Sequence, residues 1–303
     1  MDQAERLRQM VQQQNRGSQA GDADAVRHAR IITVTSGKGG VGKSIFAINL
    51  ALMFRKQGKR VIIFDADFGL ANIEVMFGVI PKYTLADLMF RGRELSEVIC
   101  DGPDGVMFVS GGSGIARLVN LDKEQIRRLV GKLSELDSIA DVVIVDTGAG
   151  ISGSVLEFVA ASPEVVLVAT PEPTSITDSY ALLKALSMFQ GFDNEHTKIM
   201  LLGNRTTSPR DGVNMYEKLS TVVDRFLNLN IEYLGCIPAD DFVVKAIMKQ
   251  SPVVMEYPNS SASKSFVQIM GRLSDGSTQT GIAKGKRGIG NFFNNVLKHN
   301  NRF

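Results

Sequence analysis

Short apolar runs recur along the middle of the chain, and the longer segments between them carry apolar residues at helical spacing. Seven runs read as strands: residues 31–35, 60–65, 105–110, 141–146, 164–169, 198–203 and 231–237. Most are continuous in Val, Ile and Leu, which is typical of parallel strands buried on both faces. The segments that read as helices include residues 44–56, 123–134, 177–189 and 212–226. This alternation predicts an α/β fold, a doubly wound, mostly parallel sheet with helices on both faces and with ligand sites at the carboxyl ends of its strands.

The composition changes at both ends of this pattern, so we divide the chain into residues 1–28, 29–271 and 272–303. In the first region Ala4, Leu7, Met10 and Val11 recur at helical spacing, which predicts a short amphipathic helix before a flexible linker at residues 17–24. Two interpretations of this apolar stripe have equal weight. The helix docks on another protein, or it packs on its own domain.

The last region begins as a tether rich in Ser, Gly, Thr and Lys and ends in a basic amphipathic segment. Five large apolar residues cover one face of the predicted helix: Ile289, Phe292, Phe293, Val296 and Leu297. From residue 284 onward the chain has five Lys and Arg and no acid, a charge of +5 against +2 for the whole chain. This pattern favours a reversible interfacial membrane anchor over the alternative, a terminal helix folded back onto the domain. Because one short helix anchors weakly, dimerisation would strengthen attachment by doubling the apolar area.

One loop has the features of a phosphate-binding site. From Gly37 to Ser44 the chain reads Gly-Lys-Gly-Gly-Val-Gly-Lys-Ser, between the first predicted strand and the first predicted helix. In this G-x-x-x-x-G-K-S pattern, backbone N–H groups surround the phosphates of a nucleoside triphosphate. Lys43 would reach the β and γ phosphates, and the Ser44 hydroxyl would bind Mg²⁺. The predicted nucleotide contacts are Gly37, Gly39, Gly40, Val41, Gly42, Lys43, Ser44 and Ile45.

Acidic residues end two of the predicted strands. Asp65 and Asp67 lie at the end of the second, and Asp146 ends the apolar run at residues 141–146. Carboxylates at this edge of the sheet would orient water and Mg²⁺ beside the γ-phosphate, and Asp146 has the position of a Walker B acid that holds Mg²⁺ through a water. No glutamate follows Asp146 to act as a strong base, which predicts slow hydrolysis.

The overall composition excludes several classes of protein. The 303 residues are 44% hydrophobic and 22% charged, with a net charge of +2, so no nucleic-acid partner is expected. Cys100 and Cys236 form no C-x-x-C pair, which argues against a disulfide framework or a metal centre within one chain. No apolar run approaches the roughly 18 residues of a membrane span. We expect a cytoplasmic protein that attaches reversibly to the inner face of the cell membrane.

A second lysine in the phosphate loop carries a family resemblance. With Lys38 after the first glycine, the loop resembles the deviant Walker A motif K-G-G-x-G-K-[ST] of the MinD/ParA ATPases. The resemblance implies ATP as the nucleotide and a face-to-face homodimer in which Lys38 acts on the partner subunit's ATP; a solvated loop charge is the alternative. The stretch from Asp65 to Asn72 looks like the D-x-D-x-G-L-x-N switch of MinD-type ATPases. In that family the residue at Asp67 positions the attacking water and the one at Asp65 supports the metal shell, while residues 148–151 resemble the second switch.

The same resemblance implies a base pocket. Asn204 and Arg205 follow the sixth predicted strand, and Pro238 and Asp240 follow the seventh. They match the family positions that frame the adenine. Any loop at this edge of a sheet can carry such residue types, so a match here is weak evidence. The match at Asn204 is more informative than those at Arg205, Pro238 and Asp240.

The N-terminus narrows the resemblance to one subfamily. Asp2, Gln3, Ala4, Leu7 and Arg8 match the D-Q-A-x-x-L-R motif of FlhG (YlxH) proteins, MinD-like ATPases that control flagellar number and placement. The resemblance implies docking of this segment on the FlhF-type GTPase, stimulation of GTP hydrolysis, and contact with flagellar switch-complex proteins or a flagellar transcription activator.

Other functions remain as alternatives. A MinD-type division-site regulator has the core and the basic tail but lacks the N-terminal motif. A DNA-partitioning ParA would need a basic DNA-binding surface and not an apolar terminal helix. An iron–sulfur carrier of the superfamily would need C-x-x-C. A binding protein that holds nucleotide with little turnover belongs to a different class, and a phosphate-release assay separates it from an ATPase.

Overall fold

The structure is a computed structural model that describes residues 28–67, 72–112, 123–275 and 288–299. The predicted N-terminal helix, with Asp2, Gln3, Ala4, Leu7 and Arg8, therefore lies outside the described residues, and so does the tether at 276–287.

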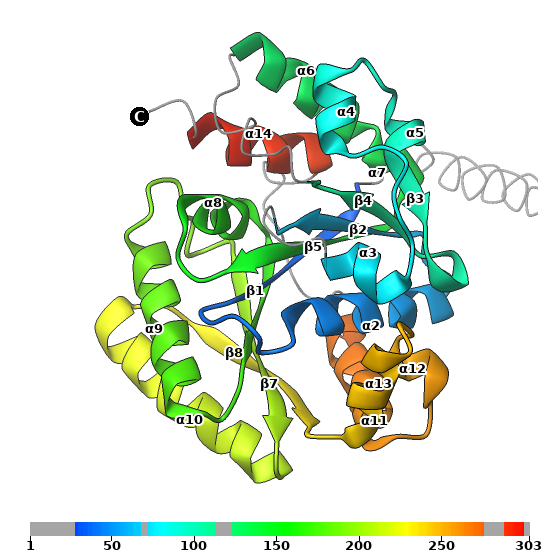
Figure 1. Ribbon diagram of the computed structural model, residues 1–303. Helices are drawn as coiled ribbons and strands as arrows, with labels where there is room; N and C mark the ends of the chain where they lie inside the picture. Colours follow the sequence, from blue (N-terminus) through cyan, green and yellow to red (C-terminus); the bar gives the residue numbers. More distant parts are fainter. Residues whose placement is uncertain (1–27, 68–71, 113–122, 276–287, 300–303) are drawn as a thin grey trace, which may run out of the picture.

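One sheet of eight strands runs through the molecule, in the order β3-β4-β2-β5-β1-β6-β7-β8 (Figure 1). The strands are β1 Arg30–Ser36, β2 Val61–Ala66, β3 Ile99–Asp101, β4 Met107–Ser110, β5 Val142–Ala149, β6 Glu164–Ala169, β7 Lys198–Thr206 and β8 Ile231–Pro238. Neighbours pair in parallel except β3, which is antiparallel to β4. The predicted doubly wound, mostly parallel fold is confirmed, and the short edge strand β3 was not predicted.

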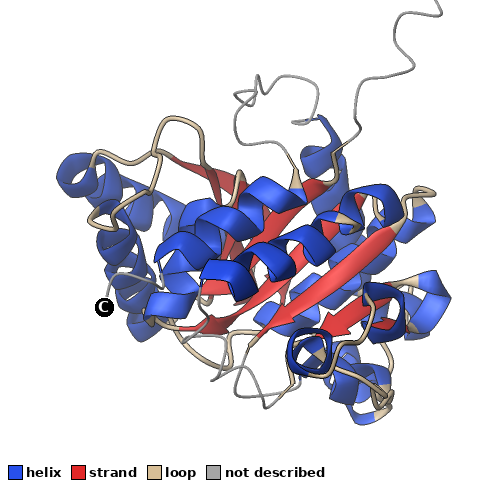
Figure 2. Ribbon diagram, turned by 90° about the horizontal axis from the view of Figure 1, so that it is seen from above, coloured by secondary structure: helices blue, strands red, loops and turns tan. Residues whose placement is uncertain are grey.

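Helices cover both faces of the sheet (Figure 2). One face carries α2 Lys43–Lys56, α3 Asn72–Phe77, α11 Asp241–Met248, α12 Val253–Glu256 and α13 Ser261–Asp275, with η1 Pro103–Gly105 near its edge. The other carries α4 Leu85–Phe90, α5 Leu95–Val98, α6 Lys123–Ser134, α7 Leu136–Ile139, α8 Gly153–Ala161, α9 Pro173–Ser187, α10 Pro209–Leu227 and α14 Ile289–His299. The helix α13 runs through Asp275, a few residues past the predicted start of the C-terminal region at residue 272.

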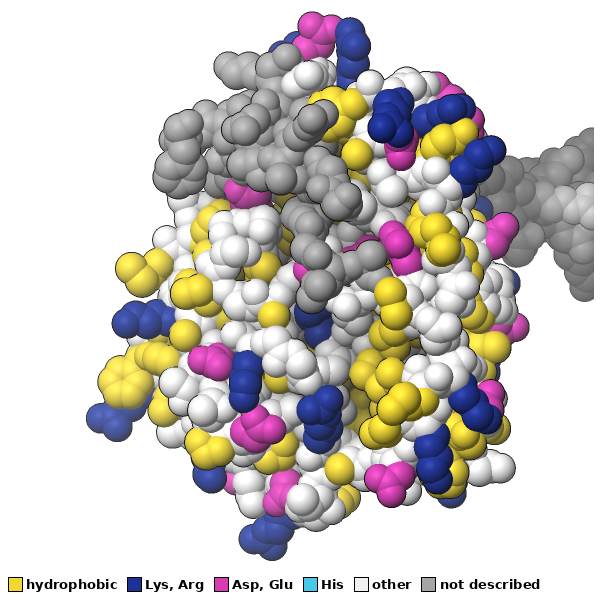
Figure 3. Space-filling view, viewed as in Figure 1, with side chains coloured by type: hydrophobic (Ala, Val, Ile, Leu, Met, Phe, Trp, Pro, Cys, Tyr) yellow, Lys and Arg dark blue, Asp and Glu magenta, His cyan; other side chains and the backbone are white. Residues whose placement is uncertain are grey.

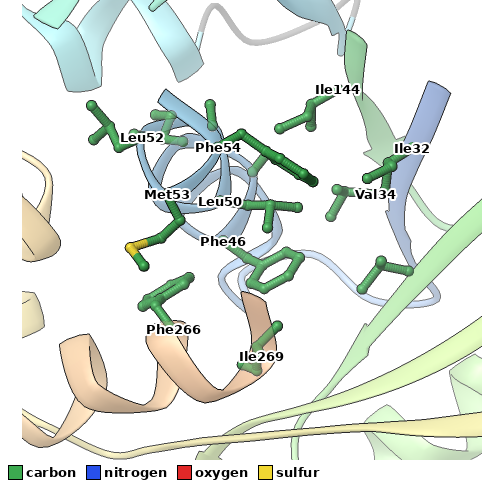
Figure 4. Close-up of a cluster of buried hydrophobic side chains, with 14 of the residues drawn as sticks. Ile32, Val34, Phe46, Leu50, Leu52, Met53, Phe54, Ile144, Phe266 and Ile269 are labelled. Atoms are coloured by element: carbon green, nitrogen blue, oxygen red, sulfur yellow. The ribbon is translucent and has the colours of Figure 1, made fainter. Parts of the chain in front are cut away.

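The helix after the phosphate loop is buried on nearly every side. Its residues 46–54 are all buried, because the sheet lies on one side and α13 on the other. Phe46 of α2 stacks on Phe266 of α13, with ring centroids 5.8 Å apart, and Ile269 lies beside this pair (Figure 4). A helix fixed this firmly holds the loop at its start in one position relative to the sheet.

The register of the sheet brings the predicted acids together. Asp65 of β2 is paired with Asp146 of β5, in the carboxyl-terminal halves of two adjacent strands; β5 continues three residues past Asp146, where the predicted strand ended. β1, which leads into the phosphate loop, is the other neighbour of β5. The candidate site therefore lies at the edge of the sheet where the fold class predicts it.

The C-terminal helix α14 packs on the domain. Its five predicted membrane residues are all buried: Ile289, Phe292, Phe293, Val296 and Leu297 are 0%, 2%, 2%, 3% and 6% exposed. They join the core formed by α4, α6, α8 and one face of the sheet. Of the two interpretations of this segment, the structure has the helix folded back onto the domain. The sequence analysis favoured the other, and a membrane role for these residues requires release of α14. Within the described parts of the chain, no helix combines the length and apolarity needed to cross a bilayer.

Candidate nucleotide site

The phosphate loop has the backbone of an anion cradle. Gly40 and Gly42 have positive φ angles of 77° and 93°, which glycine adopts without strain. Gly42 is the N-cap of α2, and its carbonyl accepts the first helical hydrogen bond, from Phe46 at 3.0 Å. A Cβ on Gly37 would lie 2.2 Å from the backbone oxygen of Asp178, so α9 packs directly against the start of the loop. A cavity of about 420 Å³ opens here, lined by Gly39, Gly40, Gly42, Lys43, Ser44, Ile45 and Asp67 among others.

Lys43 is buried in this cavity and is paired with the Walker B acid. Its Nζ lies 2.7 Å from Oδ1 of Asp146, and the two side chains are 7% and 0% exposed. Burial raises the pKa of Asp146, while the Lys43 ammonium and the Ser44 hydroxyl oppose the rise. The positive charge of Lys43 thus compensates the negative charge of an Asp146 carboxylate that is buried away from water. A triphosphate offers Lys43 a more negative partner.

The two strand-end acids are suited to a magnesium ion with its water shell. Burial raises the pKa of Asp65 to about 8, and the nearby charge of Asp146 adds to the rise. Among the described residues, Oδ2 of Asp65 and Oδ2 of Asp146 are buried without a hydrogen-bond partner. Unpartnered carboxylate oxygens on paired strands, one of them in the side chain that the Ser44 hydroxyl contacts, are oxygen donors of the kind that Mg²⁺ prefers. The residues therefore fit the predicted metal, which Ser44, Asp65 and Asp146 would hold.

Asp67 lines the same cavity, and its position is fixed by its neighbours. Its backbone N–H donates to Oδ1 of Asp65 at 3.1 Å. Nδ2 of Asn72, the first residue of α3, donates to Oδ2 of Asp67 at 3.2 Å. The sequence analysis did not assign Asn72 to the site, although the D-x-D-x-G-L-x-N spacing contains it. The structure therefore adds Asn72 as a residue that orients Asp67.

Lys38 points away from its own phosphate cavity. Its Nζ donates to Oε2 of Glu172 at 2.9 Å and to Oγ1 of Thr174 at 3.0 Å, beside the start of α9. The Lys38 and Glu172 side chains are 38% and 58% exposed, and exposed ion pairs contribute little to stability. Lys38 is thus a cation at the surface, in an interaction that is easily exchanged. The sequence analysis assigned no role to Glu172, just as it assigned none to Asn72.

A separate cavity of about 180 Å³ lies on the base side of the loop. Its lining includes Ile45, Asn204, Arg205, Pro238 and Asp240, together with apolar side chains of α11 and Phe266. Val244 and Ile247 of α11 line it while remaining 55% and 40% exposed. Hydrophobic side chains gather over α11, α12 and α3 on this side of the molecule (Figure 3). An apolar slot next to a phosphate cradle suits the face of a purine base.

Two of the predicted base-pocket residues have structural hydrogen bonds. Nδ2 of Asn204 donates to the Val41 carbonyl at 2.7 Å, which ties β7 to the phosphate loop. Both carboxylate oxygens of Asp240 accept backbone N–H groups, from Phe242 and from Ala262, each at 2.9 Å. Asp240 therefore caps α11 and braces α13, and it contributes to the pocket as a fixed wall. Arg205 lines both cavities and has a positive φ of 55°.

The nucleotide site and α14 are joined by direct packing. Phe64, the residue before Asp65, contacts Phe293 of α14 at a centroid distance of 4.9 Å. α8, whose Phe158 contacts Phe292 at 6.1 Å, begins at Gly153, immediately after the segment that resembles the second switch. The strand that ends next to Asp65 and the helix that follows residues 148–151 thus both contact α14.

A doubly wound sheet with a phosphate loop, a lysine-paired strand-end acid and oxygen donors for Mg²⁺ defines a P-loop nucleoside triphosphatase. Residues 27–274 match the ParA family model, described as NUBPL iron-transfer P-loop NTPase. The chain belongs to the MinD/ParA family of P-loop ATPases.

Individual relatives agree with this assignment. The chain is 45% identical to the antiactivator FleN of Pseudomonas aeruginosa, over 78% of this chain and 83% of that protein. It is 34% identical to the flagellum site-determining protein YlxH of Helicobacter pylori, over 90% of this chain and 91% of that protein. The crystal structure of the Pyrococcus furiosus cell division ATPase MinD has the same fold, with a TM-score of 0.64 and 24% identity over 82% of this chain and 99% of that one.

Proposed function

We propose that this protein is a dimerising ATPase switch that regulates flagellar number and placement, and that ATP controls its attachment to the membrane. The similarity to FleN and YlxH supports the flagellar role, since those relatives are named an antiactivator and a flagellum site-determining protein. A MinD-type division-site role has less support, because the septum site-determining MinD of Synechocystis is 29% identical.

Each residue of the site has a separate role in ATP hydrolysis. Lys43 exchanges Asp146 for the β and γ phosphates, which frees the Asp146 carboxylate to hold the water shell of Mg²⁺ together with Ser44 and Asp65. Bound Mg²⁺ supplies charge neutralisation at the phosphates. Asp67, held by Asn72, orients the attacking water. Without a glutamate after Asp146, proton removal is inefficient and turnover is slow.

Dimerisation completes the site through Lys38. In the single chain this lysine rests on Glu172 at the protein surface, outside its own phosphate cavity. A second subunit placed face to face would present the phosphates of its ATP, a stronger partner than one exposed carboxylate. ATP thus favours the dimer, and hydrolysis removes the γ-phosphate that holds it together.

The packing of α14 on the switch elements is the observation that carries the membrane part of the proposal. Docking buries the same five apolar side chains that insertion into a lipid surface would bury, so the two states exclude each other. Because each alternative removes a similar apolar area from water, modest movements of Phe64 or α8 can decide between them. We infer that the ATP dimer releases α14 and that two released helices bind the bilayer together.

The partner role of the N-terminal segment rests on its sequence. Residues 1–27 contain the D-Q-A-x-x-L-R motif, and we propose that they dock on the FlhF-type GTPase and stimulate its hydrolysis. The further partners are flagellar switch-complex proteins or a flagellar transcription activator.

Deletion of the gene and complementation test the flagellar role. We expect the deletion to change the number or position of flagella, the intact gene to restore them, and the Lys43→Ala variant to fail. Unchanged flagella in the deletion strain would contradict the proposal. Phosphate release measured with and without phospholipid vesicles separates the switch from a binding protein, which would show no turnover in either condition.

A further inference from the structure

A hydrogen bond next to the nucleotide site joins α3 to the sheet. The buried hydroxyl of Ser110, the last residue of β4, donates to Oε1 of Glu74 on α3. Oγ of Ser110 also accepts the backbone N–H of Gly112 at 3.2 Å, which fixes the position of the hydroxyl. Ser110 is paired in register with Asp65 on the neighbouring strand β2. The Glu74 carboxylate is therefore anchored on the strand beside the one that carries a candidate magnesium ligand.

Apolar packing holds α3 against the sheet along a single line. The helix has only six residues, and its two buried residues are Ile73 and Phe77, which lie one above the other at i and i+4. The Phe77 ring meets the Phe108 ring of β4 edge to face, with centroids 5.6 Å apart. Contacts along one line resist separation of the helix from the sheet, but they do little to oppose a roll of the helix about its axis.

Asn72 and Glu74 flank this line on opposite sides. Successive residues of an α-helix are about 100° apart, so the two side chains lie about 100° to either side of Ile73. A roll that carried Glu74 away from Ser110 would also move Asn72, which donates to Oδ2 of Asp67. With side chains about 5–6 Å from the helix axis, a roll of about 10° displaces the end of Asn72 by about 1 Å. A displacement of this size at a catalytic group can lower a rate by about 100-fold.

We propose that Glu74 and Ser110 are positioning residues for ATP hydrolysis, which set the roll of α3 and, through Asn72, the place of Asp67. The inference rests on the proposed role of Asp67 in orienting the attacking water. Because the pair acts through Asp67, it affects the rate of the chemical step and leaves the binding of ATP to the phosphate loop. What matters at Glu74 is an acceptor oxygen within reach of the Ser110 hydroxyl, and not the negative charge.

Substitutions of Glu74 separate the reach of its side chain from its charge. Glu74→Gln keeps an acceptor oxygen at the same reach, while Glu74→Asp keeps the charge but ends one methylene short of Ser110. In phosphate-release assays with Mg²⁺, we expect Glu74→Asp and Glu74→Ala to lower kcat about 10-fold, with KM for ATP within about twofold of wild type. Glu74→Gln should keep kcat within about threefold of wild type. The matched control is Val75→Ala, at a side chain of the same helix that is 62% exposed, and it should hydrolyse ATP as the wild type does.

Double variants test whether the pair acts through Asn72. Glu74→Ala combined with Asn72→Ala should lower kcat no further than the slower of the two single variants, and the same holds for Glu74→Ala combined with Ser110→Ala. Melting temperatures establish that each variant is folded, and Glu74→Asp and Glu74→Gln decide the question by themselves if an alanine variant does not fold.

The outcomes distinguish this inference from the proposed function. Effects that multiply in the double variants, a wild-type kcat for Glu74→Asp, or a Glu74→Gln variant as slow as Glu74→Asp would overturn this inference alone. A wild-type chain that releases no phosphate from ATP, with or without vesicles, would overturn the proposed ATPase switch and this inference with it.

Discussion

Phe293 of α14 meets Phe64 of β2 edge to face, with ring centroids 4.9 Å apart and ring planes at 60°. Phe64 is the residue before Asp65, the buried acid whose pKa burial raises to about 8. The amphipathic helix α14 thus rests on the strand that leads to the candidate magnesium site. Through this contact, a movement of β2 on nucleotide binding would act directly on α14.

Gly290 tests whether α14 docking restrains membrane binding. A Cβ at this position would lie 2.5 Å from Oγ of Ser134 on α6, so Gly290→Gln should weaken docking while supporting the helix itself. Overpacking of about 1–3 kcal/mol would shift the docking equilibrium roughly 5- to 150-fold toward the released state. We expect this variant to cosediment with anionic vesicles even with ADP.

The matched control is Asn291→Gln, which adds the same side chain at an exposed position of the same helix. It should keep the wild-type response to nucleotide. Equal behaviour of the Gly290 and Asn291 variants with ADP would show that docking does not limit membrane binding.

Lys43→Ala should have two separable effects. Loss of the phosphate contact should abolish ATP binding, measured by calorimetry. The change also leaves Asp146 buried without its cation, at a cost of about 3–5 kcal/mol if Asp146 stayed charged and less if it takes up a proton. A lower melting temperature without nucleotide is therefore expected, and the exposed Lys59→Ala is its control. Normal ATP affinity in the Lys43 variant would refute the phosphate-loop assignment.

Asp67→Ala should trap the ATP-bound dimer, because the water loses the side chain that orients it. We expect phosphate release to fall by about 100-fold or more, with a stable dimer in light scattering with ATP. Asn72→Ala should reduce turnover less, since it removes only the amide that holds Asp67. An Asp67 variant that stays monomeric with ATP would remove the assigned role.

The raised pKa of Glu157 on α8 predicts a specific pH dependence of the free energy of unfolding. Burial raises its pKa to about 7, against about 4.3 in an unfolded chain. Between these values the folded state retains a proton that the unfolded state has released, so the stability contribution falls as the pH rises from about 4 to about 7. Glu157→Gln should leave stability at pH 4 unchanged and raise it at pH 8 by about 1–3 kcal/mol.

Denaturant unfolding at both pH values measures this difference, with the exposed Glu217→Gln of α10 as control. Parallel changes for wild type and the Glu157 variant across the range would mean that this carboxyl is solvated in the folded protein.

Deletion of residues 1–20 should leave ATP turnover and nucleotide-dependent dimerisation intact while removing stimulation of the FlhF-type GTPase. All residues of the nucleotide site lie in the domain that begins at residue 29, which is why the two activities should separate. GTP hydrolysis by the partner measures the effect. A truncated chain that no longer folds would show instead that the segment is structural.

Local chemistry made much of this molecule predictable. The phosphate loop, its two flanking elements and the acids Asp65 and Asp146 follow from spacing and from the rule that ligands bind at the carboxyl ends of parallel strands. Continuous apolar runs identified the parallel strands, because a strand covered by helices on both faces of the sheet is apolar at successive positions. The edge strand β3 was missed because three residues, none of them fully buried, leave no such run.

Tertiary contacts decide the features that sequence did not reveal. The apolar stripe of α14 suits both a membrane and packing against α6 and α8; the sequence favoured the membrane, whereas the structure shows the packed helix. Asp240 lines the base-side cavity, and the sequence did not show that its two oxygens accept the backbone N–H groups of Phe242 and Ala262. The interaction of Lys38 with Glu172 joins residues 134 positions apart, which no local pattern reports.

Vesicle cosedimentation tests the central claim most directly, with the full chain and a chain lacking residues 288–303, each with ATP and with ADP. The account predicts that only the full chain with ATP binds the vesicles. Equal binding of the full chain with both nucleotides, or binding that survives removal of α14, would contradict it.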